Sequence, residues 1–261
     1  MSLSSWWQGL RAKQQLRRIA KHKKAIKNRY GYGEDRARAI GFFRALGGRE
    51  GYLGMLERFM INAEPGIRDE EEKEDLFEAL VELGPQIIPS IADYLKRKDA
   101  ATVPVAWPLK VLRKVASQSE AAGVIIEVLQ EMGTSYVREP ERKVSLLAQL
   151  AELEDPRVVG AVVPFLRDHR DEVRLEALAV LVRRADEAAR EPMLDLLTDE
   201  ESPMRLRASV ADALQRLGWS VKGHRKKVED SLPEGLGVDK AGKIKGRWVN
   251  SPAEEPSSGQ G

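Results

Sequence analysis

The chain holds few residues of the kinds that carry catalysis or bind metal ions. Of its 261 residues three are His and none is Cys, which excludes disulfides, thiolate nucleophiles and cysteine-bound zinc. His22, His169 and His224 lie far apart in the sequence, and none stands at metal-ligand spacing from another. Asp168 precedes His169, but a solvated turn explains that pair better than a catalytic dyad. We therefore expect no metal site.

An acidic run from Asp69 to Asp75 is the other concentration of reactive side chains. It stands at the start of a predicted helix, where the positive end of the helix dipole stabilises carboxylates, and we assign it that role. The sequence contains no glycine-rich phosphate loop, no Gly-x-Ser-x-Gly elbow and no His-Glu-x-x-His motif. We therefore expect no catalytic residues, no cofactor and no enzymatic activity.

The composition indicates the elements that carry these residues. Hydrophobic residues make up 42%, aromatic residues 6% and charged residues 32% of the chain, which suits packed amphipathic helices better than sheets. No apolar stretch approaches the ~20 residues of a membrane span, and charges recur from Arg11 onward, unlike in a secretory signal. We expect an all-α cytoplasmic protein, either free or peripheral to a membrane.

Charge is spread unevenly along the chain. Residues 1–30 carry nine Lys or Arg and no acid, and residues 222–261 carry eight against six acids, which leaves residues 31–221 at about −9. A basic arm (1–33), a body (34–219) and a flexible, basic, glycine-containing tail (220–261) are the domains that we predict.

The body contains a repeat of two helices. Residues 171–199 are predicted to contain a first helix, a short turn and a second helix that ends in Leu196-Leu197. The same sequence pattern begins again at Ser202-Pro203. The second helices end 36, 34, 37 and 31 residues apart, at Phe59, Leu95, Leu129, Leu166 and Leu197. This spacing predicts an α-solenoid of about five helix pairs and a terminal helix.

The helices of this repeat have predictable positions. First helices are expected near 34–46, 70–83, 104–116, 140–153, 171–184 and 203–217, and second helices near 49–61, 86–97, 119–132, 156–167 and 187–198. Gly47, Gly84 and Gly218 follow the first helices, as glycine often does at a helix C-terminus.

Residues 171–217 resemble the HEAT repeats of phycocyanobilin-lyase-like proteins. Asp171, Val173-Arg174, Ala177 and the closing Leu196-Leu197-Thr198-Asp199 match that phrase, and Arg205 and Ala208 repeat part of it. The resemblance implies stacked helical hairpins and brings no catalytic residue onto this chain. HEAT-like DNA glycosylases use a positively charged concave face, which the acidic body does not favour.

Two features follow from such stacking. Small residues let neighbouring helices approach closely, and these are Ala177, Ala179, Ala208 and Ala211. An aspartate at the turn, Asp168 or Asp199, can cap the next helix and face an arginine there, Arg174 or Arg205. We expect a ladder between repeats rather than an anion site.

Residues 3–30 are predicted to form one long basic helix, with three roles open to it. It could cap the first repeat, lie on anionic lipid, or run along the phosphates of a nucleic acid. The adjacent tryptophans point about 100° apart, so one is expected to face a partner or a lipid surface. The candidate binding residues on this helix are Trp6, Trp7, Arg11, Arg17, Arg18, Lys21 and Lys24.

The tail carries a second group of candidate binding residues, Arg225, Lys226, Lys227 and Trp248. The stretch 237–249 suits either a small hairpin or a segment that orders on binding, and 250–261 is expected to be disordered. The function that we predict is a non-enzymatic scaffold or adaptor that binds a protein segment in a groove lined mainly by second helices. The alternative is a peripheral binder of nucleic acid or anionic membrane through the basic ends.

Overall fold

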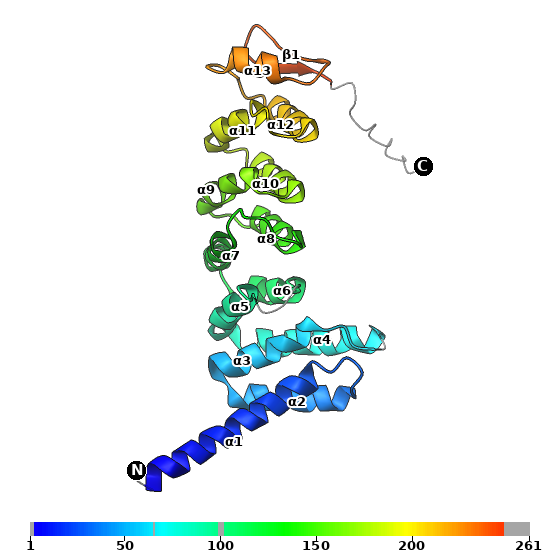
Figure 1. Cartoon of the computed structure of the whole chain (residues 1–261), viewed down its shortest axis with the longest axis vertical. Helices are drawn as coiled ribbons and strands as arrows, with labels where there is room; N and C mark the ends of the chain where they lie inside the picture. Colours follow the sequence, from blue (N-terminus) through cyan, green and yellow to red (C-terminus); the bar gives the residue numbers. More distant parts are fainter. Residues whose placement is uncertain (1–2, 65, 99–101, 248–261) are drawn as a thin grey trace. The chain divides into compact units, whose positions relative to one another are not determined.

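The fold was obtained as a computed structural model, which describes residues 3–64, 66–98 and 102–247. These residues are mostly helical, with one short hairpin, which confirms the all-α class (Figure 1). The chain divides into two compact units, one of residues 1–132 with 153–155 and the other of residues 133–152 with 156–261. The three domains predicted from the charge distribution stay a prediction.

Unit 1 consists of two layers of helices. Its helices are α1 (Leu3–Ile26), α2 (Gly33–Leu46), α3 (Gly48–Leu56), α4 (Gly66–Val81), α5 (Ile88–Leu95), α6 (Ala106–Val115) and α7 (Gln118–Met132), with 3-10 turns η1 (Glu57–Met60) and η2 (Gly84–Ile87). Helices α2, α4 and α6 contact one another in turn, as do α3, α5 and α7, and α1 packs on α2. Alternate helices therefore share a layer (Figure 1).

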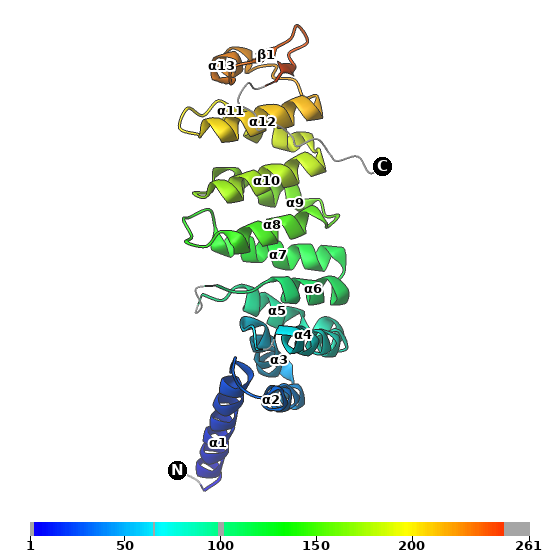
Figure 2. The ribbon, with the colours of Figure 1, turned by 90° about the vertical axis from the view of Figure 1, so that its right-hand side faces the viewer.

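Unit 2 has the same alternation. Its helices are α8 (Glu141–Ala151), α9 (Arg157–Val162), α10 (Asp171–Arg184), α11 (Arg190–Leu197), α12 (Met204–Leu217) and α13 (Arg225–Ser231), with 3-10 turns η3 (Val163–Arg167) and η4 (Glu187–Ala189). Helix α10 contacts α8 on one side and α12 on the other, and Figure 2 shows these three in one layer. Strands β1 (Leu236–Val238) and β2 (Ile244–Gly246) pair antiparallel, with Val238 opposite Ile244.

The helix pairs occur where the spacing predicts them, with ends displaced by a few residues. Gly47, Gly84 and Gly218 have positive φ angles of 63°, 65° and 66°, which glycine adopts without a steric penalty. Ala185, which ends α10, also has a positive φ, of 51°. The second helices are less regular than expected, because η1, η2, η3 and η4 replace parts of them.

Aliphatic and aromatic side chains fill the interior of each unit. In unit 1 Trp107 stacks on Phe59 with 5.7 Å between ring centroids. In unit 2 Ala177, Ala208 and Ala211 are buried as predicted, but Ala179 is exposed. The prediction for Ala179 is therefore wrong.

The long basic helix is shorter than predicted, because α1 ends at Ile26 instead of near residue 30. The guanidinium of Arg36 on α2 donates to the carbonyl oxygens of Asn28 and Gly31, at 3.0 and 2.7 Å. The turn between α1 and α2 thus leaves these two carbonyl oxygens free to accept from the buried arginine. In a continued helix they would have accepted from backbone N–H groups instead.

The tail predicted to be flexible is folded up to Arg247. Of the two possibilities for the stretch after Gly237, the structure shows the hairpin. The Asp239 carboxylate closes its turn by accepting from the backbone N–H groups of Ala241 and Lys243, each at 2.9 Å. Buried Ile244 anchors β2. Residues 250–261, where disorder was predicted, lie outside the described residues.

Candidate functional site

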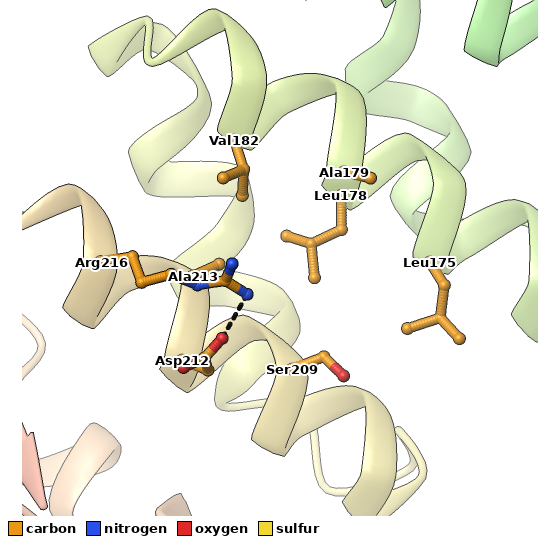
Figure 3. Close-up of a pocket in the computed structure, with 8 residues that line it drawn as sticks. All are labelled: Leu175, Leu178, Ala179, Val182, Ser209, Asp212, Ala213 and Arg216. Atoms are coloured by element: carbon orange, nitrogen blue, oxygen red, sulfur yellow. Dashed lines mark hydrogen bonds and ion pairs between the residues drawn. The ribbon is translucent and has the colours of Figure 1, made fainter. Parts of the chain in front are cut away.

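Unit 2 contains a pocket of about 250 Å³ between helices α10 and α12. From α10 the side chains of Leu175, Leu178 and Val182 point toward the space (Figure 3). Helix α12 borders it with Asp212 and Arg216, which form an ion pair four residues apart (Figure 3). The pocket has an apolar wall on one side and a charged edge on the other.

Short side chains create this pocket. Ala179 on α10 and Ser209 and Ala213 on α12 line it, where larger residues would fill the space between the two helices. The Asp212 and Arg216 side chains are 57% and 69% exposed, so their ion pair adds little to the stability of the fold. Both groups are therefore accessible to a polar partner.

The sequence did not single out this pocket. Its residues lie on first helices, whereas the predicted groove is lined mainly by second helices. The available signal was the short side chains of Ala179 on α10 and of Ser209 and Ala213 on α12. Periodicity shows which residues share a helical face, but it does not show how closely two such faces approach.

The candidate residues of the basic helix lie on α1, at the surface of unit 1. Five of the predicted cations are exposed, namely Arg11, Arg17, Arg18, Lys21 and Lys24. Trp7 is 55% exposed, whereas the side chain of Trp6 lies outside what the structure describes. The Arg18 guanidinium lies 5.3 Å from the centroid of the Phe42 ring on α2.

A hollow of about 520 Å³ opens at the C-terminal end of α1, lined by Lys23, Lys24, Lys27 and Asn28. The Lys27 ammonium lies 2.7 Å from a carboxylate oxygen of Glu57 in η1. Among the residues described here, the ammonium groups of Lys23 and Lys24 face no carboxylate at ion-pair distance. The hollow therefore carries uncompensated positive charge.

The candidate residues of the tail do not form one cationic cluster. The Arg225 guanidinium donates to Glu229 at 2.9 Å and to the carbonyl oxygens of Asp239 and Val238 at 3.1 and 3.2 Å. Arg225 thus holds α13 against the hairpin. Lys226 and Lys227 are exposed, and Trp248 lies outside the described residues.

A network of buried charges connects α2, η1 and α4 in unit 1. Arg58, fully buried, donates to Asp69 at 2.6 Å and to Glu72 at 2.9 Å. Arg36 donates to both oxygens of Glu72, and Lys73 lies 2.6 Å from Asp69. The acidic run therefore does more than stabilise a helix start, because two of its carboxylates balance buried cations.

The carboxyl groups of this network remain ionised despite their surroundings. Burial alone would raise the pKa of Asp69, but hydrogen bonds from Lys73, the Ala63 amide and Arg58 lower it below its usual value. Burial likewise opposes ionisation of Glu72, yet its bonds to Arg36 and Arg58 hold its pKa below the usual value. The cluster thus has a structural explanation, and it exposes no reactive group.

Unit 2 contains a fully buried ion pair between Lys143 on α8 and Asp168. The Lys143 ammonium lies 2.6 Å from Asp168 and also donates to the carbonyl of Ser135 at 2.9 Å. The predicted contact of Asp168 with Arg174 is wrong, since Arg174 instead lies 3.5 Å from Asp171 on its own helix. Asp168 therefore connects to the first helix before it, not to the one after it.

Asp199 also differs from the prediction. It accepts from the Glu201 backbone N–H at 3.1 Å and from the Ser202 hydroxyl at 2.8 Å. No ion pair joins Asp199 to Arg205 in the part of the chain that the structure describes. The expected ladder of aspartate and arginine between repeats is absent at both predicted positions.

The histidines differ in their surroundings. His22 stacks on Phe42 with ring centroids 4.1 Å apart, and burial, followed by the nearby Lys21 and Arg18 charges, lowers its pKa. His224 lies 2.7 Å from Glu191, and His169 is exposed. Within the described residues no group of His, Asp and Glu is arranged to hold a metal ion, and no helix has the length and apolarity to cross a membrane.

Comparison with known proteins finds no family model, no curated protein and no solved structure that matches the chain.

Proposed function

We propose that the chain is a HEAT-like α-solenoid that acts in the cytoplasm as a non-enzymatic scaffold for binding a protein segment. The alternation of helices in each unit supports the solenoid, since first helices contact first helices and second helices contact second helices. The lack of cysteine fits a reducing compartment.

Repeated turn chemistry in unit 2 supports the same architecture. The carboxylate of Asp168 accepts from the backbone N–H of Arg170, and that of Asp199 accepts from the N–H of Glu201, each two residues further on. The two turns are separated by 31 residues, the local repeat length. Equivalent positions thus carry the same residue, and its side chain makes the same hydrogen bond to the backbone two residues later.

The observation that carries the binding function is the pocket between α10 and α12. A volume of about 250 Å³ suits one or two aliphatic side chains, and burying one contributes roughly 1.5–3 kcal/mol. The ion pair of Asp212 and Arg216 beside it offers an acceptor and a donor to flanking polar groups. The ligand that fits is a short mixed-charge segment with an aliphatic anchor.

Selection of displayed peptides on the intact chain, followed by calorimetry, tests this proposal. Enriched peptides should carry an aliphatic residue between charged ones. Their affinity should fall at least tenfold in Ser209→Leu, because the added leucine side chain occupies the pocket.

Ser145→Leu is the matched control, because Ser145 is an exposed serine on the first helix α8, away from the pocket. It introduces the same apolar surface without changing the lining. Equal affinity losses in both variants, or selection of peptides with no aliphatic position, would refute binding at the α10/α12 pocket. Far-UV circular dichroism establishes that both variants remain helical.

A further inference from the structure

The cations of α1 differ from most other cations of unit 1 in having no carboxylate partner. Beyond α1, most arginines and lysines of this unit have a carboxylate partner, for example Arg44 with Glu82 at 2.7 Å and Arg29 with Glu64 at 2.7 Å. Among the described residues no lysine or arginine of α1 forms an ion pair, and the first cation that does is Lys27, just after the end of the helix. The surface of this helix thus carries a local excess of positive charge.

Four of these cations form a continuous stripe. Lys13, Arg17, Lys21 and Lys24 follow one another at spacings of four, four and three residues, which places them on one face of a helix. With a rise of 1.5 Å per residue the stripe is roughly 16 Å long. All four side chains are exposed.

The apolar face of α1 points the other way and is already covered. Ile19 and Ile26 are 4% and 0% exposed, and α1 packs on α2. At 100° per residue these isoleucines lie roughly opposite the stripe. Packing therefore fixes the orientation of α1 and directs its cationic face to solvent.

We propose that this stripe binds the phosphate backbone of nucleic acid without regard to base sequence. A row of exposed cations with successive charges about 6 Å apart can contact several phosphates of one strand at once. The hollow lined by Lys23, Lys24 and Lys27 continues the positive surface at the C-terminal end of α1. This proposal is independent of the pocket between α10 and α12.

An anionic membrane fits these observations less well. A helix that lies in a membrane interface inserts one continuous apolar face, and that face of α1 is packed against the protein. The large apolar side chains found exposed on the described part of α1 are Trp7 and Leu16, at 55% and 61%. They are nine residues apart, which places them on opposite sides of the helix, so they cannot insert together.

Fluorescence anisotropy with a labelled DNA duplex of mixed sequence, titrated with the intact chain, tests the proposal. Four phosphate contacts predict that log K falls against log salt with a slope of about −4. In K13Q/R17Q/K21Q/K24Q the slope should approach zero and the affinity at moderate salt should fall by roughly 100-fold. Glutamine preserves helix propensity, and circular dichroism verifies the fold.

The matched control removes the same charge from cations that have carboxylate partners. Arg38, Arg44, Arg49 and Lys98 are exposed and ion-paired in unit 1, so their replacement by glutamine lowers the net charge equally. The control should keep the wild-type salt slope. Equal losses in both variants would mean that net charge alone governs binding, and the stripe would be refuted.

A competition assay separates nucleic acid from membrane. Phosphatidylserine vesicles are added to the protein–DNA complex at equal phosphate concentration, and the proposal predicts that the duplex stays bound. Displacement of the duplex by the vesicles, or absence of duplex binding at low salt, would overturn it.

Discussion

Replacing Lys143 by methionine should destabilise unit 2 strongly. The side chains of Lys143 and Asp168 have no exposed surface and lie 2.6 Å apart. Methionine fills a similar volume but leaves the Asp168 carboxylate buried, with the Arg170 N–H at 2.9 Å as its remaining donor. Breaking a buried pair in this way costs about 3–5 kcal/mol.

The double variant Lys143→Met/Asp168→Asn identifies the origin of this cost. The asparagine side-chain oxygen still accepts from the Arg170 N–H, and no charge remains buried. The free energy of unfolding of the double variant should therefore exceed the additive expectation by about 2 kcal/mol or more. The exposed Lys226 serves as control, since its change to methionine should alter stability by less than about 0.5 kcal/mol.

Urea unfolding followed by far-UV circular dichroism measures these free energies, and hydrogen exchange assigns the loss to unit 2. Exchange is needed because a chain with two compact units need not unfold in one step. A cost below about 1 kcal/mol for Lys143→Met, or strictly additive effects in the double variant, would refute the assignment of a buried charge pair.

Two further predictions concern unit 1. An alanine at Gly54 would bring its Cβ within 2.2 Å of the Phe43 ring, so Gly54→Ala should lower the melting temperature, whereas Gly41→Ala on the open side of α2 should raise stability by roughly 0.5–1 kcal/mol; equal effects would contradict the packing of α2 on α3. Folding lowers the pKa values of Asp69 and Glu72, so their stabilisation is complete above about pH 5 and is lost as the pH falls through the folded values. Acid titration of Glu72→Gln should show a shallower loss than the wild type, and an unchanged profile would count against the network.

Sequence patterns predicted the helices of this chain well because the relevant signals are local. Gly47, Gly84 and Gly218 follow the first helices α2, α4 and α12, and the apolar periodicity locates the remaining first helices. The all-α class follows from the same signals. The boundaries of second helices were less accurate, since a 3-10 turn depends on how the chain meets its neighbours.

Charge pairing could not be predicted in the same way. Lys143 and Asp168 are separated by 25 residues, and Arg36 and Glu72 by 36, so each pair forms only after two helices pack. In the sequence these residues resemble the solvated charges around them. The sequence did contain one signal. Lys143 stands near the start of the first helix α8, at a position similar to that of Arg174 near the start of the first helix α10.

The two candidate surfaces depend on what packing leaves uncovered. Small residues were predicted to bring helices close together. Ala177 is buried, whereas Ala179 is exposed and lines the pocket between α10 and α12. The basic residues of α1 were predicted as one group of candidate binding residues. The burial of Ile19 shows which face of the helix packs against the protein, and therefore which cations share the opposite, solvent-facing side. Composition therefore indicates that a surface exists, and tertiary packing determines which side chains form it and which partner it can accept.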